Sequence, residues 1–231
     1  MNEYKKKFSE FLHKTSAVFF KKDLKLKDGR PTPYFFNIGN FNDGNTSYEL
    51  GKFYADMIVS NNLHKNLDII FGPSYKGSAI AQATTIALFK EHGIKVGFNY
   101  DRKEAKIHGE ASGKKDMFVG AKFFNNCNVF MVDDVITTAG TKFESLEKIW
   151  EFEKDNKIKI NLVGLGIAVD REQVTLEGEN PIQIFFAKTK ANVYAIAKAT
   201  EIIPYLVEQG KLTQENLKEF QNYLKIYGVN K

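Results

Sequence analysis

Cysteine is nearly absent from this sequence, which holds a single one, Cys127, among 231 residues. One cysteine cannot form a disulfide within the chain, and it cannot build a zinc site from cysteine ligands. A chain without a disulfide framework suits a reducing compartment. We therefore expect a cytoplasmic location.

Long apolar runs are missing as well. The longest, about residues 162–169, is far shorter than the ~20 residues that a membrane-spanning helix needs. The N-terminal residues MNEYKKKFSEFLHKTSAVFF carry charge through the stretch where a secretion signal needs an unbroken apolar segment. We expect neither a secretion signal nor an association with membranes.

Charge of one sign is not concentrated in any segment. The chain has 33 Lys and Arg against 28 Asp and Glu, a net charge of +5, spread along its length. Nucleic-acid binding usually needs a basic stripe interleaved with aromatic residues, so this distribution fits a small polyanionic ligand better. We expect no nucleic-acid partner.

The pattern of apolar residues alternates between helix and strand from about residue 47 onward. Helical spacing covers residues 48–58, 77–91, 143–152 and 213–227, and buried strands are expected at LDIIFG, KVGFNY, NVFMV and LVGLGIAV. Continuous apolar strands between helices predict a parallel sheet covered on both faces. The same reasoning predicts a further strand at PIQIFFA and a helix over residues 191–209. Residues 1–231 are expected to form one α/β domain.

Two segments interrupt this alternation. Residues 21–39 alternate in polarity and contain Pro31 and Pro33, which predicts a hairpin. We expect this hairpin to belong to a small N-terminal hood of about residues 17–46. Residues 101–116 are polar and charged and have no apolar period. Long loops of this kind in compact domains are usually functional or mobile, so we interpret 101–116 as a mobile loop.

The segment VFMVDDVITTAGT, residues 129–141, combines a strand with the start of a helix. Asp133 and Asp134 end the apolar strand, and ligands of open α/β sheets bind at the carboxyl ends of strands. Residues 137–141, which we call the cradle, offer backbone amides and hydroxyls at a helix N-terminus, where an anion is favoured. The segment matches neither a Walker loop nor a dinucleotide fingerprint.

A phosphate cradle beside two carboxylates suits a particular ligand. Carboxylates accept hydrogen bonds from vicinal hydroxyls, so a phosphate on one side and a diol on the other describe ribose 5-phosphate. The alternative is a solvated Asp-Asp turn that caps a helix, which would be the better interpretation of an isolated pair. The whole segment around Asp133 and Asp134 favours the ligand site.

This segment resembles the phosphoribosyl pyrophosphate motif of type I phosphoribosyltransferases. The segments LKLKDGRPTPYFFNIGNFNDG, FGPSYKGSAIA, RKEAKIHGEASG and VDRE resemble the orotate-specific members of that family, in the same order. The resemblance implies the type I fold, with a central parallel sheet, a hood and a mobile catalytic loop. It also implies transfer of ribose 5-phosphate from phosphoribosyl pyrophosphate to orotate in pyrimidine biosynthesis, which yields orotidine 5'-monophosphate and pyrophosphate. The cradle differs from the family motif at one point. Two residues, Thr138 and Ala139, separate Thr137 from Gly140, where many relatives have one residue.

The resemblance also implies residue roles. Lys106 is the main catalytic cation, because preorganised cations stabilise the charge that builds on departing pyrophosphate, and a loop can close to deliver them. His108, Asp133 and Asp134 complete the catalytic set. The residues implied for the donor are Tyr75, Lys76, Arg102, Lys103, Lys106, His108, Asp133, Asp134, Val135, Ile136, Thr137, Thr138, Ala139, Gly140 and Thr141. Those implied for orotate are Lys27, Phe35, Phe36, Thr137 and Arg171.

A cofactor and a partner follow from the same resemblance. Mg²⁺ is expected to bridge the pyrophosphate and ribose hydroxyls without a dedicated protein cage, because it commonly binds through substrate phosphates and a few carboxylates. A homodimer is expected in which the mobile loop completes the partner's site.

Two alternatives remain open. The acceptor could be a purine or another base, although Lys27 and Arg171 suit an acceptor with a carboxylate. The chain could also be a non-catalytic regulator that senses phosphoribosyl pyrophosphate and binds nucleic acid. The Lys106 and His108 loop argues against this regulator, and fold analogy alone cannot exclude it.

Overall fold

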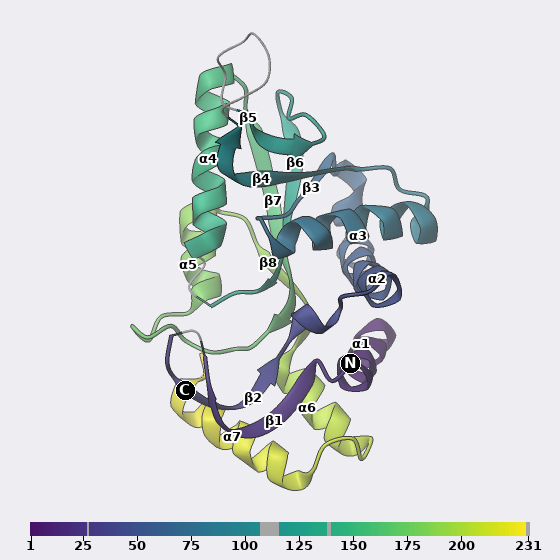
Figure 1. The fold of residues 1–231 in the computed structure, drawn as a ribbon, viewed down its shortest axis with the longest axis vertical. Helices are drawn as coiled ribbons and strands as arrows, with labels where there is room; N and C mark the ends of the chain where they lie inside the picture. The colour runs from purple at the N-terminus through teal and green to yellow at the C-terminus, as the bar shows by residue number, and fades with distance from the viewer. Residues whose placement is uncertain (27, 107–115, 138–139, 230–231) are drawn as a thin grey trace.

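A six-stranded sheet forms the centre of the molecule (Figure 1). The computed structural model describes residues 1–26, 28–106, 116–137 and 140–229, apart from the side chains of residues 105, 106 and 116. The strand order is β5-β4-β3-β6-β7-β8. All neighbours pair in parallel except β4 and β5, which are antiparallel. The strands are β3 (Ile69–Phe71), β4 (Gly97–Lys106), β5 (Asp116–Gly120), β6 (Cys127–Val135), β7 (Ile160–Asp170) and β8 (Val193–Lys198).

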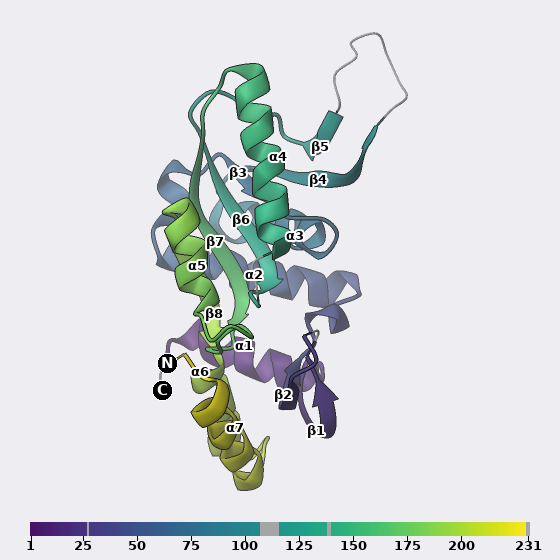
Figure 2. The ribbon, with the colours of Figure 1, turned by 90° about the vertical axis from the view of Figure 1, so that its left-hand side faces the viewer.

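Helices cover both faces of this sheet, which confirms the expected architecture (Figure 2). One face is covered by α4 (Gly140–Asn156) and α5 (Pro181–Thr189), and the other by α2 (Gly44–Ser60) and α3 (Lys76–His92). Side chains of β6 alternate between the two cores: Val129 and Met131 pack on the α4 side, and Phe130 and Val132 pack on the α2 side. Burial on both faces explains why this strand is a continuous apolar run.

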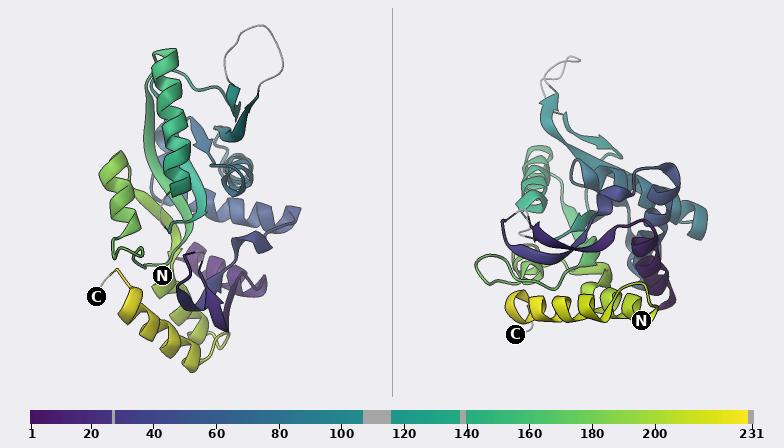
Figure 3. Two further views of the ribbon diagram at one scale, coloured as in Figure 1. Left: turned by 60° about the vertical axis from the view of Figure 1, so that its left-hand side comes forward. Right: turned by 60° about the horizontal axis from the view of Figure 1, so that its bottom comes forward.

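The hood lies against the C-terminal helices (Figure 3). Its antiparallel strands are β1 (Val18–Lys25) and β2 (Pro31–Phe36), followed by the short helix η1 (Ile38–Asn40). Tyr34 of β2 makes edge-on ring contacts with Phe220 and Tyr223, at centroid distances of 5.3 and 5.6 Å. Aromatic pairs of this geometry stabilise beyond their buried area. The remaining helices are α1 (Glu3–Lys14), η2 (Leu63–Asn66), α6 (Ala199–Glu208) and α7 (Gln214–Tyr227).

The prediction of a strand at PIQIFFA is wrong, because these residues begin α5. Asn180 precedes the helix and its side chain accepts a hydrogen bond from the Ile182 amide at 2.9 Å. Pro181 occupies the first helical turn, where its fixed φ is favourable and its missing N–H costs nothing. This capping signal decides the conformation of a short apolar run that periodicity leaves ambiguous.

Two further boundaries differ from expectation. Residues 191–209 are not one helix, since β8 pairs with β7 before α6 begins. The polar segment 101–116 is not wholly a loop, because Asp101 and Lys106 pair with Phe118 and Asp116 across the β4–β5 hairpin. An edge hairpin is held by backbone hydrogen bonds, so it can form without an apolar period. Residues 107–115 lie outside the described part of the chain.

No helix within the described ranges is long and apolar enough to cross a membrane.

Candidate active site

The carboxyl ends of β3, β4, β6 and β7 lie along one edge of the sheet, because these neighbouring strands run in parallel. The loop after β3 holds Tyr75 and Lys76, β6 ends in the aspartate pair, and Arg171 follows β7. The fold therefore gathers segments that are far apart in the sequence, as expected for a ligand site of an open α/β sheet.

The loop after β3 is folded tightly by two glycines. A Cβ atom on Gly72 would lie 1.9 Å from the carbonyl oxygen of Gly77, and one on Gly77 would lie 2.9 Å from the carbonyl oxygen of Val132. Larger residues at either position would force the backbone apart. The close approach places Lys76 at the start of α3, beside the end of β6.

Lys76 forms an ion pair with Asp134 at the end of β6. Its Nζ donates to Asp134 Oδ2 at 2.9 Å, and the hydrogen bond is the main reason that the pKa of Lys76 is raised. The Asp134 side chain is largely buried, whereas 63% of the Lys76 side chain is exposed. Lys76 therefore presents a charged amine to solvent while its position is held by a carboxylate.

Asp133 points into the protein and has partners that the sequence analysis did not identify. Its Oδ2 accepts from the Lys142 Nζ, its Oδ1 accepts from the Asp134 amide at 2.9 Å, and its carbonyl accepts from the Tyr54 hydroxyl at 2.7 Å. Burial raises the pKa of Asp133, and the Lys142 charge opposes that rise.

Lys142 is only 4% exposed and also donates to the Val135 carbonyl at 2.7 Å. The sequence does contain an indication that Lys142 is buried. The buried stripe of α4 consists of Lys142, Ser145, Leu146 and Ile149. Residues spaced by three and four lie on one helix face. Extending the apolar stripe backward from Leu146 would have identified Lys142. Tyr54 lies within the apolar pattern of α2, and nothing in the sequence marks its hydroxyl.

The cradle begins between β6 and α4. Val135 is half-buried, and Ile136 packs its side chain into the core on the α4 side, so only its backbone is available to a ligand. Thr137 is half-buried, and Gly140 and Thr141 are exposed in the first turn of α4. Thr138 and Ala139 lie outside the described residues.

The cations of β4 approach the same edge. Arg102 is half-buried, and Lys103 is exposed with its Nζ 6.0 Å from the centre of the Tyr75 ring. The backbone of Lys106 belongs to β4, but its side chain is not described, and His108 lies in the segment outside the described residues. The structure therefore brings Lys103 close to Tyr75 in the loop after β3. The roles of Lys106 and His108 stay predictions.

Arg171 lies beneath the hood with 5% exposure. Its guanidinium carbon is 4.8 Å from the centre of the Tyr34 ring and 5.9 Å from that of Phe35, and one terminal nitrogen donates to Thr32 Oγ1 at 3.4 Å. Among the described residues nothing forms a hydrogen bond with its buried Nε. A buried donor of this kind is costly to leave unsatisfied, so a bound acceptor would stabilise it.

The two hood phenylalanines differ in their surroundings. Phe35 is half-buried beside Phe19 and Arg171, whereas Phe36 is 5% exposed and packs in the core against Tyr34. Adjacent residues of a strand face opposite sides. Phe35 is therefore placed to contact a ligand near Arg171, and Phe36 supports the hood. Lys27 lies outside the described residues.

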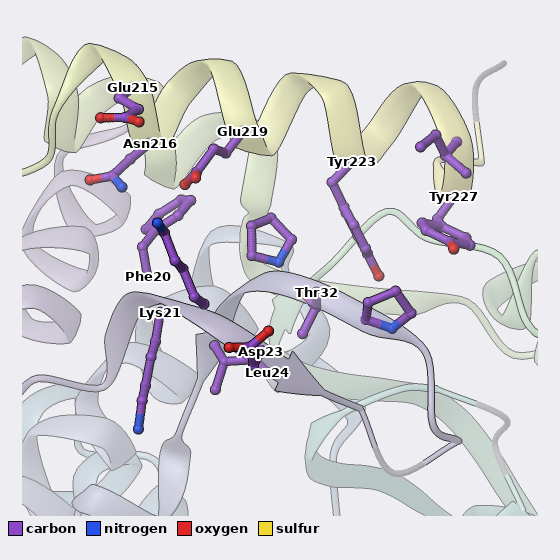
Figure 4. A pocket seen from close by; sticks show the side chains of 14 residues that line it. Phe20, Lys21, Asp23, Leu24, Thr32, Glu215, Asn216, Glu219, Tyr223 and Tyr227 are labelled. Carbon is purple, nitrogen blue, oxygen red and sulfur yellow. The ribbon is translucent and has the colours of Figure 1, made fainter.

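A separate groove of about 560 Å³ lies between the hood and α7 (Figure 4). Lys21, Lys22 and Asp23 line its hood side, and Glu215 and Glu219 line its helix side. Its lining includes none of the residues that we predicted for the donor or for orotate. The candidate site is therefore the strand edge and not this groove.

Comparison with known proteins identifies the family. No family model matches the chain. It is 36% identical over 229 residues to the orotate phosphoribosyltransferase of Vibrio cholerae, covering 99% of this chain and 100% of that one. It is 37% identical over 201 residues to that of Bifidobacterium adolescentis, covering 85% and 83%. The crystal structure of orotate phosphoribosyltransferase from Francisella tularensis superposes with a TM-score of 0.78 at 29% identity, over 96% of this chain and 99% of that one. The chain belongs to the orotate phosphoribosyltransferase family.

Proposed function

We propose that this chain transfers ribose 5-phosphate from phosphoribosyl pyrophosphate to orotate, yielding orotidine 5'-monophosphate and pyrophosphate. The Lys76–Asp134 ion pair, 2.9 Å across two neighbouring strand ends, carries the proposal. It sets a cation suited to pyrophosphate beside a carboxylate suited to ribose hydroxyls, next to the helix N-terminus at Gly140. Family membership supports the same assignment.

The donor would be held along the strand edge. Asp134 and Asp133 accept hydrogen bonds from the ribose hydroxyls; each carboxylate oxygen has two lone pairs, so the existing contacts leave acceptor capacity. The cradle amides and hydroxyls bind the 5-phosphate at the start of α4. Lys76 contacts the pyrophosphate, together with Tyr75, Arg102, Lys103 and Lys106.

The reaction is a displacement at the anomeric carbon. N1 of orotate gives up its proton and forms a bond to that carbon while the bond to the pyrophosphate oxygen breaks, so pyrophosphate and one proton are released. Positive charge develops on the ribose ring in the transition state. Negative charge develops on the leaving oxygens, where Lys106 and the other cations stabilise it. His108 assists by donating a hydrogen bond or a proton to the departing group.

The acceptor would lie between the hood and the end of β7. Orotate is planar and carries a carboxylate, so it can pack on Phe35 and accept hydrogen bonds from Arg171, including from the buried Nε. Charge-assisted hydrogen bonds are among the stronger polar contacts. Lys27 and Thr137 complete the proposed orotate set, and Phe36 supports it from the core of the hood.

Mg²⁺ would bind at the carboxyl edge of the sheet through the phosphates of the donor. No group of three or more His, Cys, Asp or Glu side chains suited to a metal occurs among the residues described, and Asp133 and Asp134 are each paired with a lysine. Mg²⁺ commonly binds through substrate phosphates and retains several waters. When bound, it neutralises charge on the pyrophosphate.

The experiment that tests the function measures product formation by the purified chain with phosphoribosyl pyrophosphate and Mg²⁺. Orotate, uracil, adenine and hypoxanthine are supplied separately and in competition. Orotidine 5'-monophosphate formed from orotate, with little product from the other bases, is expected. A preference for a purine would overturn the acceptor, and RNA or DNA binding without turnover would favour the regulator.

Replacing Arg171 with alanine is expected to lower kcat/KM for orotate roughly ten- to a hundredfold, because a hydrogen bond to a charged group contributes about 1.5–3 kcal/mol. Uracil, which lacks the carboxylate, should lose less. Steady-state kinetics with both bases measures the difference. Arg171→Met keeps an unbranched side chain beneath the hood without the guanidinium and should reproduce the orotate-specific loss. Equal losses for the two bases would remove Arg171 from this role.

We also propose a cytoplasmic homodimer. The β4–β5 hairpin lies at the edge of the sheet, and its strand β4 carries Arg102 and Lys103 of the proposed donor set. A two-fold dimer presents each surface twice, so this segment can complete the partner's site. The single cysteine suits the reducing compartment.

A further inference from the structure

Asp101 carries a carboxylate in the interior, in the middle of β4. The residue is 1% exposed. A buried charge is expensive unless it is paired and hydrogen-bonded. Its Oδ1 accepts from the Ser74 amide at 2.8 Å, and its Oδ2 accepts from Ser145 Oγ at 3.2 Å and from Lys148 Nζ at 2.5 Å. The Ser74 hydroxyl also donates to the Asp101 carbonyl.

These partners come from three separate elements. Ser74 belongs to the loop after β3, Asp101 to β4, and Ser145 and Lys148 to α4. Lys148 Nζ donates in addition to the Arg102 carbonyl at 2.9 Å. A single carboxylate and a single amine therefore join segments that are 27 to 47 residues apart in sequence.

Each joined element carries residues of the proposed donor site. Ser74 directly precedes Tyr75 and Lys76, and Asp101 directly precedes Arg102 and Lys103. α4 begins at Gly140, in the cradle. Two of the joined segments thus continue directly into groups that would bind pyrophosphate, and the third is the helix whose first turn would bind the 5-phosphate. Neither Asp101 nor Lys148 belongs to that set.

We propose that Asp101 and Lys148 are positioning residues that hold the loop after β3, the middle of β4 and helix α4 in one arrangement competent for catalysis. The inference rests on the proposed function. Lys148 contacts both the Asp101 side chain and the Arg102 backbone, so it determines the direction in which β4 leaves the sheet toward Lys106. Displacing catalytic groups by about 1 Å can cost on the order of a hundredfold in rate.

Lys148→Met is the first test. It keeps most of the stem and removes the ammonium, so we expect kcat to fall roughly ten- to a hundredfold. KM for orotate should stay within about twofold, because Phe35 of β2 and Arg171 directly after β7 belong to elements that Lys148 does not join. Lys148→Arg keeps a cation and should recover most of the turnover. Lys154→Met, an exposed position in the last turn of the same helix, is the matched control.

The double variant Asp101→Asn/Lys148→Met separates positioning from stability. It removes both charges, so no unpaired charge is buried, and thermal unfolding should return toward that of the wild type. Turnover should nevertheless stay low, because the link between β4 and α4 is lost. Folded variants with wild-type kcat, or turnover that recovers together with stability in the double variant, would overturn the proposal. A wild-type chain that makes no orotidine 5'-monophosphate would overturn the proposed function, and this inference with it.

Discussion

Replacing Lys142 with methionine is expected to lower the free energy of unfolding by about 3 kcal/mol, because removing one partner of a buried ion pair leaves the other charge uncompensated. The Lys142 and Asp133 side chains are 5% and 10% exposed, so water cannot replace the lost partner. Donor binding should weaken as well, since Asp133 belongs to the proposed ribose site. Denaturant unfolding and titration with phosphoribosyl pyrophosphate measure the two effects.

The loss of stability in Lys142→Met should depend on pH. Burial already raises the pKa of Asp133 above its ordinary value of 3.8, and the lysine opposes this rise. Without the lysine the folded state retains a proton on Asp133 more readily than the unfolded state. The penalty is therefore full above the raised folded pKa and disappears as pH falls toward 3.8. The difference from the wild type should shrink between pH 7 and pH 4.

Two controls accompany this variant. Lys154→Met removes an exposed charge from the same helix and should change stability by less than about 0.5 kcal/mol. Asp133→Asn combined with Lys142→Met removes both charges and should recover much of the lost stability. If Lys142→Met is as stable as Lys154→Met at pH 7, the ion pair contributes little to the fold.

Replacing Lys106 with alanine is expected to lower kcat roughly a hundredfold or more with a small change in KM, because the cation is needed chiefly when charge develops on the leaving pyrophosphate. Steady-state kinetics with both substrates measures the changes in kcat and in KM separately. Lys122→Ala, an exposed position beyond β5, should behave like the wild type. Wild-type turnover with only a raised KM would remove Lys106 from this role.

The same variant tests whether the segment after β4 serves the partner's site. Lys106→Ala chains are mixed with Lys76→Ala chains, each inactive by itself. If the segment reaches across a two-fold interface, one site of each hybrid receives both wild-type lysines and activity returns after subunit exchange. Verified hybrid dimers that stay as inactive as their parents would show that Lys106 acts within its own subunit.

The amino-acid sequence by itself determined the architecture and the place of the aspartate pair at the carboxyl edge of the sheet. Continuous apolar runs and the 3.6-residue helical period predicted the parallel sheet and its covering helices, because strands buried on both faces are apolar throughout. The aspartate pair and the cradle follow a strand directly, so their place at the carboxyl edge could be predicted from their neighbours. The apolar run PIQIFFA was wrongly predicted to be a strand, because the Asn180–Pro181 cap decides between helix and strand there.

Only the tertiary structure decided how the buried charges are paired. Lys142 and Lys148 lie in a helix with many charged residues, where a lysine ordinarily faces water, and Asp101 begins a polar segment that showed no apolar period. Their partners are 9, 47 and 27 residues away in sequence. Pairing over such separations depends on how helices pack on strand ends, which local periodicity does not encode. The carboxylates of Asp101 and Asp133 are stable in the interior because packing brings lysines to them.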